Sequence, residues 1–166
     1  MNHHQDKDEM DRLFPHIRNY QRLASRHGIR DIFQDNGGKI LQLLLVTGLS
    51  ILPGREGNDA RDAEGREYEL KTVNRKLTKS FSTHHHMNPV ILTKYREVIW
   101  MFGVYDDIEL DTIYQLNPKV LEPFFAKWED QWHDRDGKDL NNPKIPLSFV
   151  ESEGELVFRS TGNPSI

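Results

Sequence analysis

Cysteine is absent from the 166 residues, so the chain can form neither a disulfide nor a thiolate metal site. Long apolar runs are also missing. The longest, Ile40 to Val46, is interrupted by Gln42 and is far too short to span a membrane. The polar, acidic N-terminal region lacks the apolar core of a signal peptide. These absences favour a protein of the reducing cytoplasm with no membrane contact.

The length is typical of one domain, and we expect a single domain over residues 1–166. The chain contains 3 Trp, 5 Tyr and 8 Phe, and these side chains argue against disorder because they can bury enough area to offset chain entropy. Patterns typical of helices and strands follow each other along the chain, which predicts an α/β fold.

Charge is distributed unevenly along this acidic chain, whose formal net charge is -4. The segment 71–96 carries six basic residues and no acidic residue, so the rest of the chain carries -10, since -4 minus +6 is -10. A basic segment inside an acidic protein indicates a local site for anions.

Hydrophobic periodicity and capping residues predict the elements. The first helix is expected to begin near Pro15, which a helix interior tolerates poorly, and to stop at Gly28. Asp35 and Asn36 stand where the second helix needs an N-cap, and Asn88 precedes a later helix. We expect further helices at about 38–47, 90–97 and 121–132, strands at 67–74, 98–105 and 112–116, irregular chain over 51–65, and a closing hairpin of 148–150 with 155–158.

Asp59, Glu69 and Lys71 are the residues whose types and spacing point most directly to chemistry. Side chains two positions apart share one face of a strand, which places Glu69 beside Lys71, and Asp59 arrives from the preceding loop. Converging carboxylates can hold a hard cation such as Mg²⁺. A neighbouring ammonium can stabilise the charge that develops on a phosphodiester.

By spacing alone, the same pattern also fits the solvated face of an ordinary strand. The alternation favours the functional interpretation. Tyr68, Leu70 and Thr72 point to one side, so Glu69 and Lys71 share the other side with Val73, which a simple two-faced surface strand does not require.

Five sequence blocks add a second kind of information. They are FQDNGGK at 33–39, LPGREGNDA at 52–60, EYELK at 67–71, FSTHHHMNPV at 81–90 and KDLNNPKIP at 138–146. In order and spacing, from about Phe14 to Val150, they resemble the PvuII family of type II restriction endonucleases, within the PD-(D/E)xK nuclease superfamily. The first ten residues and those after about 151 lie outside this resemblance.

The resemblance implies a restriction-endonuclease-like core in which a central mixed β-sheet is flanked by helices. It also implies a homodimer, formed partly through the N-terminal helix, that binds double-stranded DNA and uses one or two Mg²⁺ ions per active site. Such an enzyme cuts the palindrome CAGCTG at its centre and leaves blunt ends. A cognate DNA methyltransferase is then expected as a functional partner, because host DNA needs protection.

Roles transfer residue by residue onto the matching positions. Asp59 and Glu69 become metal-binding carboxylates, and Lys71 becomes the catalytic lysine. Tyr95 is implied as a further metal-site ligand, and Glu56 could support a second ion. Asn58 stands where the superfamily often has proline before the aspartate.

Base recognition is expected from histidine and asparagine side chains, which suit the acceptors of guanine and the mixed edge of adenine. The resemblance implies that His85 and His86 contact guanine, and that Asn142, with Asn141, contacts adenine. Other interpretations remain for each segment: three histidines also fit an adventitious metal patch, and two asparagines before proline also fit a turn. The resemblance further implies that Ser82 and His84 make neighbouring base or backbone contacts and that Asp35 approaches the minor groove. Asp35 also fits a helix cap.

Three alternatives remain open. A relative with the same catalytic residues could read a different sequence, although the intact histidine and asparagine blocks favour an unchanged site. A DNA-binding module without cleavage would gain nothing from two carboxylates near phosphates. A histidine-ligated zinc hydrolase lacks the His-Glu-x-x-His spacing.

Overall fold

Strand β3 (Glu67–Asn74) forms where apolar and polar side chains alternate, and its predicted bounds are confirmed. Tyr68 and Leu70 join one cluster of buried side chains, whereas Val73 joins the other. Each face of this strand is therefore covered by a separate part of the core. The computed structural model of the chain describes residues 4–52 and 59–161.

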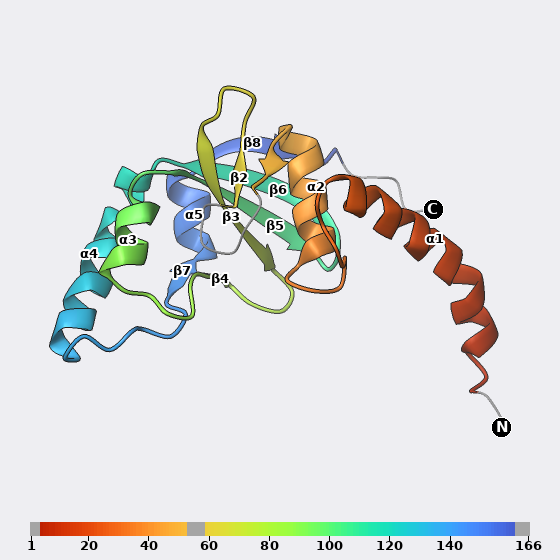
Figure 1. Cartoon of the computed structure of the whole chain (residues 1–166), viewed down its shortest axis with the longest axis horizontal. Helices are drawn as coiled ribbons and strands as arrows, with labels where there is room; N and C mark the ends of the chain where they lie inside the picture. Colours follow the sequence, from red (N-terminus) through yellow and green to blue (C-terminus); the bar gives the residue numbers. More distant parts are fainter. Residues whose placement is uncertain (1–3, 53–58, 162–166) are drawn as a thin grey trace.

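The central sheet has the strand order β1-β2-β3-β5-β6-β8 (Figure 1). β3 pairs in parallel with β5 (Ile99–Asp106), and the other neighbouring strands pair antiparallel, so the sheet is mixed. Its remaining strands are β1 (Ser50–Ile51), β2 (Ala60–Arg61), β6 (Glu109–Leu116) and β8 (Glu155–Arg159). A separate two-stranded ribbon consists of β4 (Ser80–Ser82) and β7 (Lys144–Pro146).

Helices cover both faces of the sheet, which confirms the expected α/β architecture. α2 (Gly37–Thr47) buries Leu41, Leu43 and Leu44 in one cluster, together with the end of α1 (Lys7–Arg26). α3 (Pro89–Tyr95), α4 (Pro118–Asp134) and α5 (Leu147–Glu153) contribute to the other cluster. A fully buried leucine contributes about 1.5–3 kcal/mol relative to an exposed one, so these faces hold the helices on the sheet.

Helix α1 begins at Lys7, so the prediction of a start near Pro15 is wrong. The first half of the helix extends away from the sheet (Figure 1). Of its residues, only Ala24 near the C-terminal end is buried. Proline removes one backbone hydrogen bond and crowds the carbonyl four residues earlier, and an exposed carbonyl can bind water instead. The helix therefore continues through Pro15.

The N-cap prediction for α2 is confirmed in position, because Asn36 is the N-cap residue, but the side-chain capping that it implied does not occur within the described part of the chain. Asn36 precedes the helix with a left-handed φ of 59°, and, among the described residues, its side chain makes no capping hydrogen bond. At α3 the corresponding prediction holds, because the Asn88 side chain accepts hydrogen bonds from the N–H groups of Val90 and Ile91. Asn88 is extended, with φ -151°, which is the backbone geometry that lets a side chain reach those groups.

The predicted closing hairpin is half wrong. Residues 148–150 lie in helix α5, and only 155–158 form a strand, β8, which pairs with β6. Leu147 and Val150 have helical spacing and are both buried. A Cβ at Gly154 would approach the Val150 carbonyl oxygen to 2.5 Å, so glycine permits the chain to leave the helix there.

The segment 51–65, expected to be irregular, begins with the last residue of β1 and contains β2 at Ala60–Arg61. β6 begins at Glu109 rather than Thr112. None of the helices in the described ranges is long and apolar enough to cross a bilayer.

Candidate active site

Glu69 and Lys71 lie on the same face of β3, as predicted, and form an ion pair through Glu69 Oε1 and Lys71 Nζ. Both are sheltered: Glu69 is 4% exposed and the Lys71 side chain 14%. The pair is therefore not on a solvated strand face, where such contacts contribute little. It lies where charge–charge interactions are strong.

Asp59 is placed beside this pair by the β2–β3 hairpin. Its backbone N–H donates to the Tyr68 carbonyl at 3.0 Å, and its Oδ2 accepts from the Leu70 N–H at 2.8 Å. Burial is the main reason that the pKa of the Glu69 carboxyl is raised, and the nearby negative charge of Asp59 adds to this effect. The structure thus brings the three residues singled out in the sequence into one cluster.

Burial is the largest influence on the ionisation of this cluster. It raises the pKa of Glu69, and Asp59 acts in the same direction, while Lys71 opposes both. Burial is also the largest single influence on Lys71 and disfavours its ammonium, but the negative charges of Glu69 and Asp59 and the hydrogen bond to Glu69 together outweigh burial, so the pKa of Lys71 is raised. Lys71 is therefore a fixed cation at neutral pH rather than a general base.

Tyr95 joins the cluster from the last turn of α3. It is buried, and its hydroxyl lies near enough to the Glu69 carboxylate to favour the charged form and so to oppose the rise in the pKa of Glu69. Burial is the main reason that the pKa of Tyr95 is raised, so the phenol keeps its proton. The Lys71 Nζ lies 5.8 Å from the centre of the Tyr95 ring. This position adjoins the carboxylates, as the resemblance implies.

The chemistry of these donors fits a hard divalent cation. Two carboxylates beside one ammonium leave the cluster with excess negative charge, which a divalent cation would balance. Their oxygen atoms are also the ligands that Mg²⁺ prefers. No group of three or more histidine, aspartate or glutamate side chains converges on a metal position within residues 4–52 and 59–161. Glu56, expected to support a second ion, lies outside the described residues.

A cleft of about 800 Å³ brings the catalytic and recognition candidates together. Lys71 and Asp59 line it from β3 and from the start of the β2–β3 hairpin. Asp35 lines it from the loop before α2, and Ser82 lines it from β4. His85 lines it from residues 83–87, which contain the three histidines and are called the histidine segment below. Five residues selected from four separate sequence blocks therefore face one hollow.

Asn142 is held against the histidine segment by two hydrogen bonds. Its side-chain oxygen accepts from the Thr83 N–H at 2.9 Å, and its own N–H donates to the His84 carbonyl at 2.9 Å. Met87 and Leu140 pair through two hydrogen bonds of 2.9 Å. The loops carrying the histidines and asparagines thus form one unit beside the β4–β7 ribbon.

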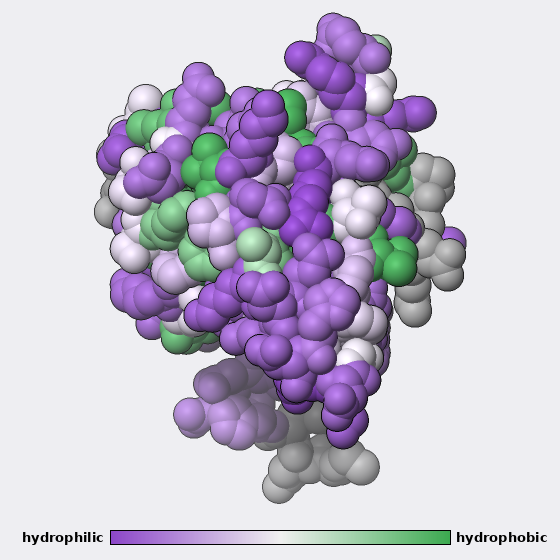
Figure 2. All heavy atoms as spheres, turned by 90° about the vertical axis from the view of Figure 1, so that its left-hand side faces the viewer, coloured by the Kyte–Doolittle hydropathy of each residue, from purple (hydrophilic) through white to green (hydrophobic). Residues whose placement is uncertain are grey.

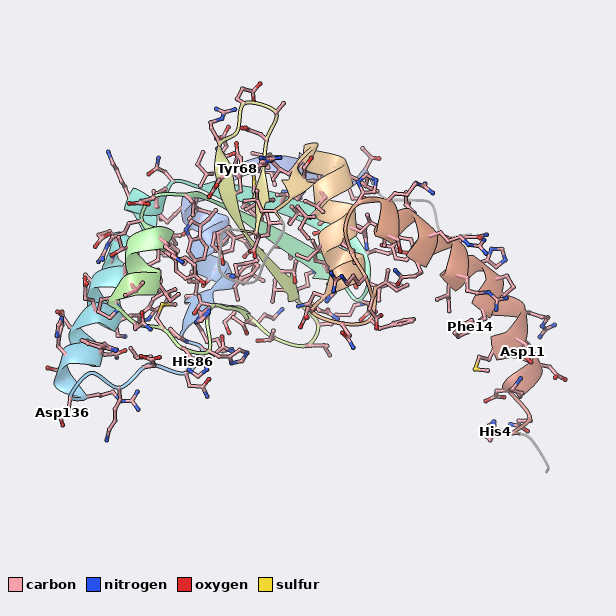
Figure 3. All side chains as sticks on the ribbon, in the orientation of Figure 1. His4, Asp11, Phe14, Tyr68, His86 and Asp136 are labelled. Atoms are coloured by element: carbon pink, nitrogen blue, oxygen red, sulfur yellow. The ribbon has the colours of Figure 1, made fainter. Side chains whose placement is uncertain are left out.

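The three histidines differ in their surroundings. His85 and His86 lie in a turn, and His86 is exposed at the edge of the molecule (Figure 3). The His85 Nδ1 lies 3.4 Å from the Asn141 side-chain oxygen. His84 is more sheltered: its Nδ1 accepts from the His86 N–H at 3.0 Å, and burial lowers its pKa.

The basic segment carries less available charge than its count implies. Lys71 pairs with Glu69, and Arg75 pairs with Asp106 and Asp111. Ion pairs of the same kind engage Lys76 with Asp106 and Asp107, and Arg96 with Glu122 and Glu129. At least four of the six basic residues therefore meet carboxylates from outside the segment, and of these pairings the linear sequence indicated only that of Lys71 with Glu69.

Sequence reasoning missed several residues at the site. Thr83 lines the cleft beside Ser82, and Lys144 donates to the Ser82 hydroxyl at 2.7 Å. The ring centre of Trp100 lies 5.8 Å from Lys71 Nζ. Lys144 and Thr83 stood within sequence blocks already singled out, so neighbouring position was an available signal. Trp100 could have been found only from the pairing of β3 with β5, in which it lies opposite Glu69.

Comparison with known families agrees with this geometry. A family model described as restriction endonuclease PvuII matches residues 5–158. The chain belongs to the PvuII restriction endonuclease family. As a member of this family it is a type II site-specific DNA nuclease, which hydrolyses phosphodiester bonds. The matched range includes every candidate site residue of this PvuII-family chain.

Proposed function

We propose that this PvuII-family enzyme cuts double-stranded DNA at CAGCTG in a Mg²⁺-dependent reaction that leaves blunt ends with 5′-phosphates. The observation that carries the proposal is the shared cleft, which Asp59 and Lys71 line together with Ser82 and His85. A phosphodiester seated there would contact catalytic groups while neighbouring bases meet the recognition loops. The intact histidine and asparagine blocks support an unchanged recognition sequence.

Asp59 and Glu69 are proposed to hold the metal ion, with Tyr95 as a further contributor and Glu56 as a candidate for a second ion. When bound, Mg²⁺ supplies Lewis acidity and makes an attacking water easier to deprotonate. The ammonium of Lys71 stabilises the negative charge that develops on the phosphodiester oxygens. Because its pKa is raised, Lys71 performs this role without titrating near neutral pH.

The recognition unit is proposed to enter the major groove. There His85 and His86 contact guanine, and Asn142, with Asn141, contacts adenine. In this arrangement Ser82 and His84 make neighbouring contacts, while Asp35, which also lines the cleft, approaches the minor groove. The hydrogen bonds between Asn142 and the histidine segment support one rigid reading surface rather than two independent loops.

A palindrome is proposed to be read by a twofold homodimer that uses each set of side chains twice. The projecting half of α1 supports this, because Met10, Leu13 and Phe14 are 47%, 54% and 41% exposed. Phe14 lies on that half, away from the sheet (Figure 3). A methyltransferase that protects host DNA is proposed as the functional partner. By contrast, the α3–α4 end of the molecule presents a mainly hydrophilic face (Figure 2).

The test is digestion of a plasmid that contains one CAGCTG site. Parent protein with Mg²⁺ should give blunt linear product, whereas Ca²⁺ or the Lys71→Met variant should give none. Cleavage at other sequences would keep the catalytic assignment and overturn the recognition sequence. Binding without cleavage in Mg²⁺, Mn²⁺ or Co²⁺ would overturn the nuclease assignment of the site.

A further inference from the structure

The Lys71 ammonium lies beside two aromatic rings that are in contact with each other. Its Nζ is 5.8 Å from the ring centre of Tyr95 and 5.8 Å from that of Trp100. Both distances fall within the range in which an aromatic face attracts a cation, and the attraction is stronger where water is excluded. The carboxylate of Glu69 fixes one side of the ammonium, and the rings bound it elsewhere.

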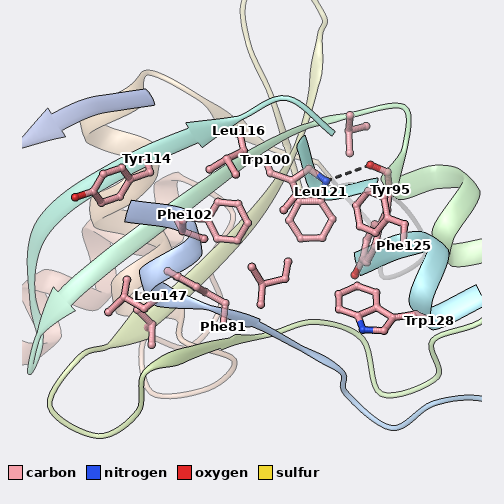
Figure 4. Close-up of a cluster of buried hydrophobic side chains, with 14 of the residues drawn as sticks. Phe81, Tyr95, Trp100, Phe102, Tyr114, Leu116, Leu121, Phe125, Trp128 and Leu147 are labelled. Carbon is pink, nitrogen blue, oxygen red and sulfur yellow. Dashed lines mark hydrogen bonds between the residues drawn. The ribbon is translucent and has the colours of Figure 1, made fainter. Parts of the chain in front are cut away.

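Trp100 contacts more than the lysine. Its indole N–H donates to the Tyr95 backbone carbonyl at 3.1 Å, as the dashed line in Figure 4 shows. The Tyr95 ring packs edge-on against Trp100, with ring centres 4.6 Å apart. In the parallel β3–β5 register Trp100 is the partner of Glu69. One fully buried side chain thus adjoins Glu69, Lys71 and Tyr95 at once.

The rest of the Trp100 ring is held by the core. It stacks on Phe102 with ring centres 5.6 Å apart and meets Phe125 of α4 at 5.8 Å. A ring restrained on both sides by aromatic neighbours has little freedom to rotate. The Trp100 ring can therefore restrain the positions of the groups that it contacts.

We propose that Trp100 is a positioning residue for DNA cleavage, which holds the Lys71 ammonium against Glu69 and anchors the end of α3 that carries Tyr95. The inference rests on the proposed catalytic role of Lys71. Trp100 acts through Lys71 and Tyr95 and touches neither DNA nor the reacting atoms. Losing it should slow the chemical step while leaving DNA affinity intact, because it lies behind the residues that face the cleft.

The kinetic test compares Trp100 with Trp128, a buried tryptophan of the same core cluster whose ring packs on Phe124 and Phe125. Leucine and phenylalanine variants of each are assayed for single-turnover cleavage with Mg²⁺ and for affinity toward CAGCTG DNA with Ca²⁺. All assays are run well below the melting temperature of each variant. Trp128→Leu and Trp128→Phe therefore control for loss of packing.

Trp100→Leu is expected to lower the cleavage rate by about tenfold or more, equivalent to about 1.4 kcal/mol of barrier, with little change in DNA affinity. Trp100→Phe keeps an aromatic face and should recover most of this loss. Should Trp100→Leu fail to fold, Trp100→Phe is expected to cleave about threefold more slowly than Trp128→Phe, because it lacks the indole N–H. The proposal would be overturned if Trp100→Phe and Trp128→Phe cleaved at equal rates. It would also be overturned if Trp128→Leu lost as much of the cleavage rate as Trp100→Leu.

A spectroscopic test is independent of cleavage. The chain has 3 tryptophans, so Trp128→Phe with Trp132→Phe leaves Trp100 as the only one. Adding Lys71→Met should change the emission spectrum of Trp100, because a charge near the indole is removed. In the matched variant that keeps only Trp128, the same change should have no effect. An unchanged Trp100 spectrum would contradict the contact with Lys71.

The two tests separate this proposal from the assignment of Lys71. If Lys71→Met cleaves at the parental rate, the catalytic role of Lys71 fails and the kinetic role of Trp100 fails with it. If Lys71→Met is inactive but Trp100→Leu cleaves normally, the assignment of Lys71 stands and only the positioning role is overturned.

Discussion

The Asn142 side-chain oxygen accepts a hydrogen bond from the Thr83 N–H at 2.9 Å, which ties the two proposed DNA-reading loops together across 59 residues of sequence. This oxygen is therefore committed to the protein, while the amide NH₂ is the part suited to the adenine N7 acceptor. Asn142 also has a left-handed φ of 53°, which asparagine tolerates better than most residues.

Asn142→Asp should separate the structural role from the recognition role. Aspartate keeps an acceptor for Thr83 but lacks the NH₂ donor. Stability should change by less than about 0.5 kcal/mol, and binding to CAGCTG DNA should weaken by about 1–3 kcal/mol. Asn142→Ala should lose both. Thermal unfolding and DNA titration in Ca²⁺ measure the two effects, with non-specific DNA as the control for added charge. Strong destabilisation of Asn142→Asp would contradict this division.

Lys71→Met should leave the buried Glu69 carboxylate without its cation and destabilise the protein by about 3–5 kcal/mol at neutral pH. Adding Glu69→Gln should recover much of this stability without recovering cleavage. Urea unfolding of the single and double variants measures the coupling. A double variant no more stable than Lys71→Met would show that the ion pair is not the source of the loss.

The same single variant should respond to pH in a defined direction. Because the folded-state pKa of Glu69 is raised above its ordinary value, the unfolded state loses its proton first as pH rises. Stability of Lys71→Met should therefore be greatest in acid and fall as pH rises above about 4.5, the ordinary glutamate pKa. Glu69→Gln should flatten this profile.

His84 should make the protein less stable in mild acid. Burial lowers its pKa from 6.5, and the positive charge of Lys71 acts in the same direction, so the unfolded state binds the proton more readily. Stability should therefore fall as pH drops below 6.5. His84→Asn keeps an acceptor for the His86 N–H but does not titrate. Melting temperatures between pH 5 and 7.5 should lose this dependence in His84→Asn and keep it in His85→Asn.

The apolar side of α1 should determine the oligomeric state. Serine at Met10, Leu13 and Phe14 should weaken the homodimer at least tenfold, because these exposed side chains would otherwise be buried against a second copy. Sedimentation velocity over a range of protein concentrations measures this. The control carries serine at Asp8 and Arg12, on the opposite side of the helix at 100° per residue. Equal dissociation of both variants would argue against this surface.

The elements that sequence predicted best are those whose side chains alone determine their form. β3 was correct at both ends because its alternation is regular, and Asn88 was correct as a cap because it acts on its immediate neighbours. The start of α1 was missed because solvent can satisfy the carbonyl that Pro15 frees. Residues 148–150, which lie in α5, were read as a strand because so short a segment fits either a helix or a short buried strand, and only packing distinguishes these forms.

The site divides in the same way. Spacing on one strand was enough to place Glu69 beside Lys71. The neighbourhood of Trp100 depends on the parallel register between β3 and β5, and no local pattern records which residue of one strand faces which of another. The neutralised charges of Arg75 and Arg96 were likewise hidden, because their carboxylate partners come from β5, β6 and α4.

The β2–β3 hairpin has a consequence for how the site assembles as the chain folds. Asp59 and Glu69 meet through a short local turn, whereas Trp100 reaches Glu69 only after β4 and α3 have crossed to the parallel strand. Short loops close with less entropy loss and more quickly than long ones. We therefore expect the two carboxylates to meet in water, where their repulsion is screened, and to be sealed from solvent only when the slower crossover is complete.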